Sequence, residues 1–200
     1  MATVVLASAS PRRRDLLAAV GFDLEVVPAD LDESRHDGES PEVYVARLAR
    51  AKAVSVARHH HGAVVLGADT TVDLDGEILS KPHDPSEARA MLKRLSARTH
   101  RVHTAVAAVR EDQILDALVT TLVTFVPVTD EMLEWYLSTG EPFDKAGGYG
   151  IQGAGGVLVD QVRGSVSNVV GLPLAETVSL LGRLGLVPGS VSAPTRRSYL

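Results

Sequence analysis

The 200-residue chain contains no cysteine, and this absence excludes several kinds of site. Without thiolates there is no disulfide framework, no cysteine-ligated zinc and no cysteine nucleophile. Apolar runs are short as well, and none approaches the ~18 residues that a membrane-spanning helix needs. The first apolar run precedes its positive charges, which is the reverse of a secretory signal. We therefore expect a cytoplasmic protein with no membrane partner.

The chain also has no excess of positive charge and few aromatic side chains. The chain has 20 Lys and Arg against 25 Asp and Glu, a net charge of −5, and only three Phe, four Tyr and one Trp. Nucleic-acid binding depends on neutralising phosphates and, for single strands, on aromatic stacking. We expect no nucleic-acid partner. A local arginine cluster in such an acidic chain favours a small anionic ligand instead.

The composition is that of a globular protein, with 45% hydrophobic and 22% charged residues. We expect one domain over residues 1–187 and a disordered polar tail over 188–200. Strand and helix signals alternate at first, and a long antiparallel pair follows, which predicts an α/β fold with a mixed sheet. The predicted strands are 3–7, 23–27, 63–68, a hairpin over 72–78, 101–109, 114–125 and 155–162; the predicted helices are 11–21, 40–61, 84–95, 129–137 and 173–184.

Three consecutive arginines follow the first strand. Ser8 to Pro11 form a small-residue turn, and Arg12, Arg13 and Arg14 stand where the next helix begins. Cations are unfavourable at a helix N-terminus, because that end already carries partial positive charge. A bound phosphate explains them, since free backbone N–H groups, a serine hydroxyl and guanidinium forks all bind anions. The alternative is a solvated arginine run.

Two carboxylates are candidates for metal or water binding. Asp69 comes directly after the predicted strand 63–68, where ligands of open α/β sheets collect. A carboxylate there suits a divalent cation or an attacking water. Its alternative role is to cap a turn. Glu33, in the acidic loop before residue 40, is a second oxygen ligand or part of a solvated surface.

Of two lysines in notable positions, one is a candidate for a phosphate contact. Lys52 lies on a predicted helix where Arg47 and Arg50 share a face and Lys52 projects elsewhere, and this group fits an exposed basic helix surface. Lys81 precedes a proline, so its backbone is held extended next to the predicted hairpin. A solvated loop lysine is the alternative for Lys81.

A second unusual stretch covers residues 144–153. Four glycines within seven residues permit close approach of the backbone to a ligand. Gln152 offers both a donor and an acceptor, which is what reading the edge of a nucleobase requires. The same glycines also fit a turn without a ligand.

Other chemically suggestive groups are assigned structural roles. His59, His60 and His61 are consecutive on a predicted helix end, so they point in different directions and suit the helix dipole. Asp73 and Asp75 are assigned to the hairpin turn. The serines at 8 and 10 have no histidine–aspartate partners, which argues against a serine nucleophile.

Six segments together resemble the Maf family of nucleoside triphosphate pyrophosphatases. They follow one another in the family's order across about residues 3–185, which is nearly the whole chain. They are LASASPRRR at 6–14, ESPEVYVARLARAKA at 39–53, LGADTTV at 66–72, EILSKPHD at 77–84, EPFDKAGGYGIQG at 141–153 and GSVSNVVGLPL at 164–174.

This resemblance implies a fold related to the inosine triphosphatases: an elongated mixed sheet with flanking helices and two lobes around a cleft, in a homodimer. It also implies hydrolysis of the α–β phosphoanhydride of a nucleoside triphosphate to the monophosphate and pyrophosphate. Asp69 is then the catalytic residue, and a divalent metal, Mg²⁺ or Mn²⁺, is expected on Glu33 and Asp69. The expected substrate-binding residues are Ser8, Arg12, Arg13, Lys52, Thr70, Lys81 and Gln152.

The resemblance extends to a subfamily. Arg12, Thr70 and Gln152 match the branch that resembles dTTP/UTP pyrophosphatases, whereas the branch acting on 7-methyl-GTP differs at these positions. Ala97 and Arg98 depart from the family pattern without touching the site residues. The alternative function is a non-enzymatic nucleotide-binding regulator linked to cell division and septum formation, the process that gave the family its name.

Overall fold

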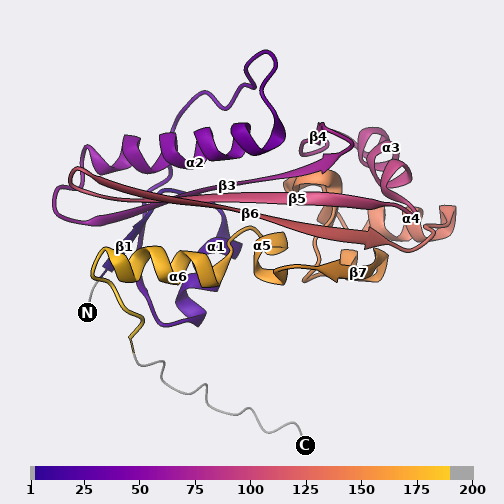
Figure 1. Cartoon of the computed structure of the whole chain (residues 1–200). Coiled ribbons are helices and arrows are strands. Elements are labelled where there is room, and N and C mark those ends of the chain that lie inside the picture. Colours follow the sequence, from indigo (N-terminus) through magenta and orange to yellow (C-terminus); the bar gives the residue numbers. More distant parts are fainter. Residues whose placement is uncertain (1–2, 190–200) are drawn as a thin grey trace, which may run out of the picture.

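A mixed seven-stranded sheet forms the centre of the computed structural model, which describes residues 3–189 (Figure 1). The strands are β1 (Thr3–Leu6), β2 (Asp23–Val26), β3 (Val64–Leu74), β4 (Glu77–Leu79), β5 (Thr99–Arg110), β6 (Gln113–Phe125) and β7 (Val159–Arg163). Their order is β2-β1-β3-β5-β6-β7, and β4 pairs with β3. β1 is parallel to β2 and β3, and the other pairs are antiparallel. The predicted mixed α/β sheet is confirmed.

Helices cover both faces of the sheet (Figure 1). α2 (Pro41–Ala57) packs along β3 and β5 on one face. α1 (Pro11–Ala19), α5 (Val166–Val170) and α6 (Leu174–Arg183) lie on the other face, and α3 (Pro85–Leu95) and α4 (Asp130–Ser138) lie at the far end of the sheet. Three short 3-10 turns precede β7: η1 (Glu141–Asp144), η2 (Ala146–Gly148) and η3 (Ala154–Leu158).

Two large apolar clusters lie at opposite ends of the long strands. One joins β1, α1 and α6 through buried residues that include Leu17, Leu66 and Leu181. The other joins β4, α3 and α4 through Leu79, Leu92 and others. β3 and β5 contribute to both clusters, so the elongated sheet carries two lobes, as predicted.

Strand β3 is longer than predicted. The sequence analysis ended this strand at residue 68 and placed Asp69 after it, but β3 runs on to Leu74, with Asp69 in its middle. Thr70, Thr71 and Val72 are β-branched, and nearly the whole strand is buried, so these residues favour an extended backbone over a turn. The predicted hairpin is confirmed, with Asp75 and Gly76 at positive φ between β3 and β4.

Two other element boundaries were predicted wrongly, and one short helix was not predicted. α2 ends at Ala57, not near residue 61. After it the chain tightens into a 3-10 turn, because the backbone N–H groups of His59 and His60 donate to the carbonyls three residues back. The predicted strand 155–162 begins as the 3-10 turn η3, which its glycines permit. α5, capped by Ser165, was not predicted.

Part of the predicted tail, residues 190–200, lies outside the described residues. Within residues 3–189, no helix combines the length and the apolar character needed to cross a bilayer.

Candidate active site

The candidate site opens where the sheet has a gap along one edge of β3. β1 pairs with residues 64–66 of β3, and β4 pairs with residues 72–74 of the same strand. Among the described residues, none pairs as a strand with positions 67–71 on that edge. Asp69 lies in the middle of this gap, just beyond the carboxyl end of β1. This is the place that the topology rule for α/β sheets predicts for a ligand, although Asp69 itself is not at a strand end.

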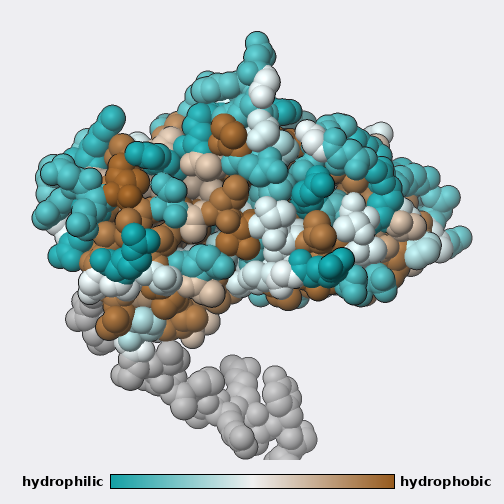
Figure 2. All heavy atoms as spheres, viewed as in Figure 1, coloured by the Kyte–Doolittle hydropathy of each residue, from teal (hydrophilic) through white to brown (hydrophobic). Residues whose placement is uncertain are grey.

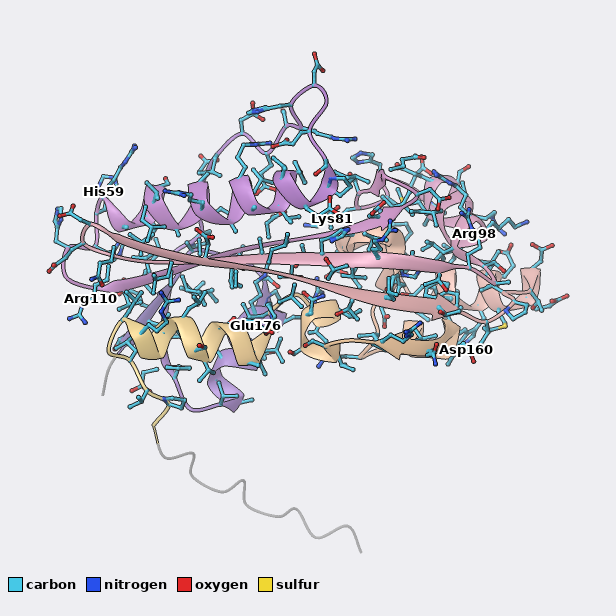
Figure 3. All side chains as sticks on the ribbon, in the orientation of Figure 1. His59, Lys81, Arg98, Arg110, Asp160 and Glu176 are labelled. Atoms are coloured by element: carbon cyan, nitrogen blue, oxygen red, sulfur yellow. The ribbon has the colours of Figure 1, made fainter. Side chains whose placement is uncertain are left out.

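A cavity of about 1180 Å³ occupies the gap and reaches both faces of the sheet. It is large enough for a nucleoside triphosphate, since small-molecule pockets measure about 300–1,000 Å³. All nine predicted site residues line it: Ser8, Arg12, Arg13, Glu33, Lys52, Asp69, Thr70, Lys81 and Gln152. In Figure 3, Lys81 lies just beyond the N-terminal end of α2, while His59 is at the opposite end of that helix.

Lys52 joins the two predicted metal-binding carboxylates. Its Nζ donates to Asp69 Oδ1 at 2.7 Å and lies 2.8 Å from Glu33 Oε1. Lys52 and Asp69 are each 8% exposed, so this is a buried ion pair rather than part of the exposed basic surface that the sequence left open. Arg50 on the same helix is exposed. α2 therefore places Lys52 against the sheet and Arg50 in solvent.

Burial raises the pKa of the Asp69 carboxyl, and the positive charges of Lys52 and Arg13 act in the opposite direction. The raised pKa makes Asp69 a stronger base than a solvated aspartate. An aspartate that neighbours two cations and still has a raised pKa is typical of a functional site.

Arg13 is buried and joins three segments of the chain. Its guanidinium donates to Gly171 O at 2.8 Å, to Ser8 Oγ at 2.9 Å and to Thr70 Oγ1 at 3.0 Å. Burial lowers its pKa. Three of its five N–H groups are used in these bonds, so two remain for a ligand. The hydroxyl proton of Ser8 is also free to donate, because Ser8 Oγ accepts both from Arg13 and from the Ser10 N–H.

The other two arginines of the cluster point elsewhere. Arg12 Nη1 donates to Asp144 Oδ2 at 2.8 Å, and this ion pair links the start of α1 to the glycine-rich segment across the cavity. Arg14 pairs with its neighbour Asp15 and is exposed. Two of the three arginines therefore face the cavity, and the solvated alternative applies only to the third.

The loop that carries Glu33 is tied to α2. The Tyr44 hydroxyl donates to Glu33 O at 3.0 Å, and Arg47 donates to Ser34 O at 2.9 Å. Arg47 also forms a two-pronged ion pair with Glu39, at 2.7 and 2.8 Å, which lowers the pKa of that carboxyl to about 2. Figure 2 shows hydrophilic residues over the part of this loop that rises above α2. The inner end of the loop carries Glu33, which lines the cavity.

The glycine-rich segment forms another wall of the cavity. Gly147 has a φ of +70°, and its N–H donates to Ser80 O, next to Lys81. The Glu141 carboxylate accepts from Ala154 N at 2.8 Å and from Gly155 N at 3.0 Å, and so fixes the turn that presents Gln152.

Several cavity residues were missed in the sequence analysis. Tyr44, Glu141, Lys145 and Tyr149 also line the cavity. All four lie inside segments that were already singled out, but only their contacts show which of them turn inward. Lys145 donates to Glu141 O at 2.9 Å and adds a further cation to the cavity wall.

Comparison with known proteins places these segments in one family. The family model described as Maf-like protein matches residues 3–184. The chain belongs to the Maf-like protein family. This Maf-like chain is 58% identical to a Myxococcus xanthus protein named dTTP/UTP pyrophosphatase, over 92% of the chain and 93% of the relative. A relative of the same name from Escherichia coli is 51% identical over 90% of the chain and 92% of the relative. The solved Ham1 protein of Staphylococcus aureus is 15% identical and gives a TM-score of 0.45, over 62% of the chain and 71% of the structure.

The donor set of the Maf-like chain fits a hard divalent cation. The carboxylates of Glu33 and Asp69 converge on a single positively charged group, the Lys52 ammonium. Each carboxylate has a second oxygen beyond that contact. An all-oxygen donor pair next to a phosphate-sized cavity is typical of magnesium sites that use one or two carboxylates and the substrate phosphates.

Proposed function

We propose that this chain hydrolyses the α–β phosphoanhydride of dTTP and UTP, releasing the nucleoside monophosphate and pyrophosphate. The observation that carries the proposal is the buried Asp69, which lies in a gap of the sheet between Lys52 and Arg13 and faces a cavity of nucleotide size. The names of the relatives at 58% and 51% identity support the same reaction.

Positive groups on several elements bind the triphosphate. Arg12 and Arg13 on α1, Lys52 on α2, Lys81 after β4 and Lys145 after η1 all line the cavity. They neutralise the phosphates and stabilise the charge that develops on the leaving pyrophosphate. Ser8 adds a hydroxyl donor to the same end of the cavity.

Glu33 and Asp69 would hold a Mg²⁺ or Mn²⁺ ion. When bound, the ion supplies charge neutralisation and polarises the phosphate oxygens. Asp69 orients the attacking water and accepts its proton, and the raised pKa of its carboxyl suits that task. Lys52 keeps the Asp69 side chain in one orientation through the 2.7 Å bond.

Gln152 reads the base. Its amide offers one donor and one acceptor, which is the pattern needed for the edge of uracil or thymine. Thr70 shapes the neighbouring wall, because its hydroxyl is fixed by Arg13 and by Thr104 Oγ1 at 2.9 Å.

We further propose that residues 1–187 form one domain and that the protein acts in the cytoplasm as a homodimer. The two apolar clusters share β3 and β5, which favours one folding unit. Sedimentation of the purified protein tests the dimer.

The function is tested by incubating the purified protein with Mg²⁺ and separate solutions of dTTP, UTP and 7-methyl-GTP. We expect pyrophosphate and monophosphate from dTTP and UTP and little product from 7-methyl-GTP. Release from 7-methyl-GTP alone would contradict the role of Gln152. Tight nucleotide binding without any product would favour the non-enzymatic regulator.

A further inference from the structure

A second group of metal-binding side chains lies on β3, four residues beyond Asp69. It consists of Glu42 in the first turn of α2, Asp73 on β3 and His103 on β5, and one ligand atom of each lies within 4.8 Å of the others. Asp73 and His103 are 2% and 1% exposed. None of the three lines the cavity, and four residues of strand span about 13 Å. This cluster is separate from the candidate active site.

The contacts of Asp73 differ from the sequence interpretation. Asp73 Oδ1 does accept from the Gly76 N–H at 2.6 Å, so the residue takes part in the hairpin turn as expected. Its other oxygen, Oδ2, lies 3.2 Å from His103 Nε2, and His103 belongs to β5 and not to the turn. The carboxylate therefore serves two purposes, and the second was not predicted.

The geometry suits a small first-row dication. His103 Nε2 lies 3.2 Å from Asp73 Oδ2 and 3.9 Å from Glu42 Oε1. Zinc holds nitrogen and oxygen ligands at about 2.0–2.2 Å in a tetrahedral arrangement, which places neighbouring ligand atoms roughly 3.3–3.6 Å apart. Glu42 is only partly buried, so its side chain has room to close the small difference and leaves a path for the ion.

Second contacts hold the two buried ligands in place. His103 Nδ1 lies 2.8 Å from Thr120 Oγ1 on β6, which fixes the ring and turns Nε2 toward the carboxylates. The Gly76 N–H fixes Asp73 in the same way. Outer partners of this kind are characteristic of metal-binding histidines and carboxylates.

The charges also favour a cation at this point. Two carboxylates face one imidazole nitrogen. The Arg101 guanidinium, 3.3 Å from Asp73 Oδ2, competes for that oxygen, and because its side chain is half exposed it can move into solvent when the ion binds. The imidazole distinguishes this cluster from the all-oxygen pair of Glu33 and Asp69. Nitrogen donors select zinc-like metals, whereas carboxylates alone suit magnesium.

We propose that Glu42, Asp73 and His103 bind one Zn²⁺ ion, with water completing its coordination. The ion joins the N-terminal end of α2 to β3 and β5. Since α2 also carries Lys52, bound zinc stabilises the helix that positions the Asp69 carboxylate. The proposal concerns a structural site and does not depend on the reaction proposed above.

The test is a calorimetric titration of the metal-free full-length protein with Zn²⁺ alone. The Asp69→Asn background is used throughout, so that the active-site carboxylates contribute less. We expect one zinc per chain, with affinity reduced about tenfold or more in Glu42→Gln and His103→Gln. Glu42 is partly exposed in a first helical turn, so Glu42→Gln keeps the fold even if His103→Gln does not. Zinc should also raise the melting temperature, and less so in Glu42→Gln.

Two controls separate this site from other sources of binding. Replacing His59, His60 and His61 together with glutamine removes the other histidine group and should leave the zinc affinity unchanged. Glu131→Gln removes a first-turn carboxylate from α4 instead of α2 and should also have no effect on zinc binding. Unchanged affinity in Glu42→Gln, loss of binding in the triple histidine variant, or no zinc binding at all would each overturn the proposal.

Discussion

Arg13 shows how the role of a charged residue depends on its partners. The sequence places three arginines at one helix start, but their environments differ: Arg13 is buried among three acceptors, Arg12 pairs across the cavity, and Arg14 pairs with the next residue. The residue types and their order in the sequence predicted that Arg12 and Arg13 belong to the site. The partners Gly171 and Asp144 could not be predicted, because they lie more than 130 residues away in sequence.

Replacing Arg13 with lysine tests the importance of its three-way contact. Lysine keeps the charge but lacks the planar fork, so at least one of Ser8 Oγ, Thr70 Oγ1 and Gly171 O loses its donor. Each lost hydrogen bond to a charged donor costs about 1.5–3 kcal/mol. We expect Arg13→Lys to lower the free energy of unfolding by that amount in urea. The matched control Arg14→Lys, on the exposed surface, should change it by less than about 0.5 kcal/mol. Equal effects in both variants would show that the buried contacts add no stability.

At the scale of elements, the site depends on how closely α2 lies against β3. Gly67 faces the helix, and a Cβ at this position would lie 2.3 Å from Ala49 O and 2.6 Å from Ala53 N. Both the helix and the first part of the strand were predicted from the sequence. The continuation of β3 through Asp69 was not predicted, because a polar segment after an apolar run is also typical of a turn.

Gly67→Ala should therefore force α2 away from the sheet. The two clashes are with backbone atoms, which cannot move independently of the helix. We expect loss of several kcal/mol of stability and a large fall in turnover, because Lys52 no longer reaches Asp69. Gly182→Ala is the matched control: this helical glycine in α6 has open space around it, and alanine there should stabilise by about 0.5–1 kcal/mol. A Gly67→Ala variant with normal stability and turnover would contradict the close contact.

The packing of β5 against the glycine-rich segment makes stability sensitive to acid. His100 on β5 is buried edge-to-face against Phe125 and Tyr149, and its Nε2 lies 2.8 Å from the Tyr149 hydroxyl. Burial lowers the pKa of His100 to about 4. The unfolded chain, with a pKa near 6.5, binds the proton first, so stability is lost as pH falls from about 6.5 to about 4.

We expect this loss to be on the order of 3 kcal/mol in the wild type. His100→Gln, which has no proton to gain, should show a smaller decline in unfolding free energy between pH 7 and pH 4.5. Urea titrations at several pH values measure the difference. Parallel curves for the two proteins would assign the acid sensitivity to other groups.

At the scale of the whole molecule, one elongated sheet holds two apolar clusters with the cavity between them. The order of strand and helix signals predicted the mixed sheet, and the resemblance of six short segments implied the two lobes and the family. Each of these segments contributes residues to the cavity in the folded chain. The resemblance also implied a cleft, but the gap along β3 that forms the cavity was not predicted. It results from β1 ending early and β4 starting late along β3, and strand lengths of this kind are decided by packing rather than by local sequence.

The same architecture explains how distant residues act on one ligand. A single gap in the sheet brings together side chains from five parts of the chain. These are the segment after β1, α2, β3, the segment after β4 and the glycine-rich segment. Asp69 lies at the centre of this gap and is the residue on which the proposed reaction depends most.

The most direct test compares Asp69→Asn with the wild type in single-substrate turnover of dTTP with Mg²⁺. Asparagine keeps the size of the side chain but cannot accept the proton of the attacking water. We expect pyrophosphate release to fall by ~10²–10³ or more, with an unchanged circular dichroism spectrum and with retained binding of a non-hydrolysable dTTP analogue. Turnover at the wild-type rate in a folded Asp69→Asn protein would contradict the account.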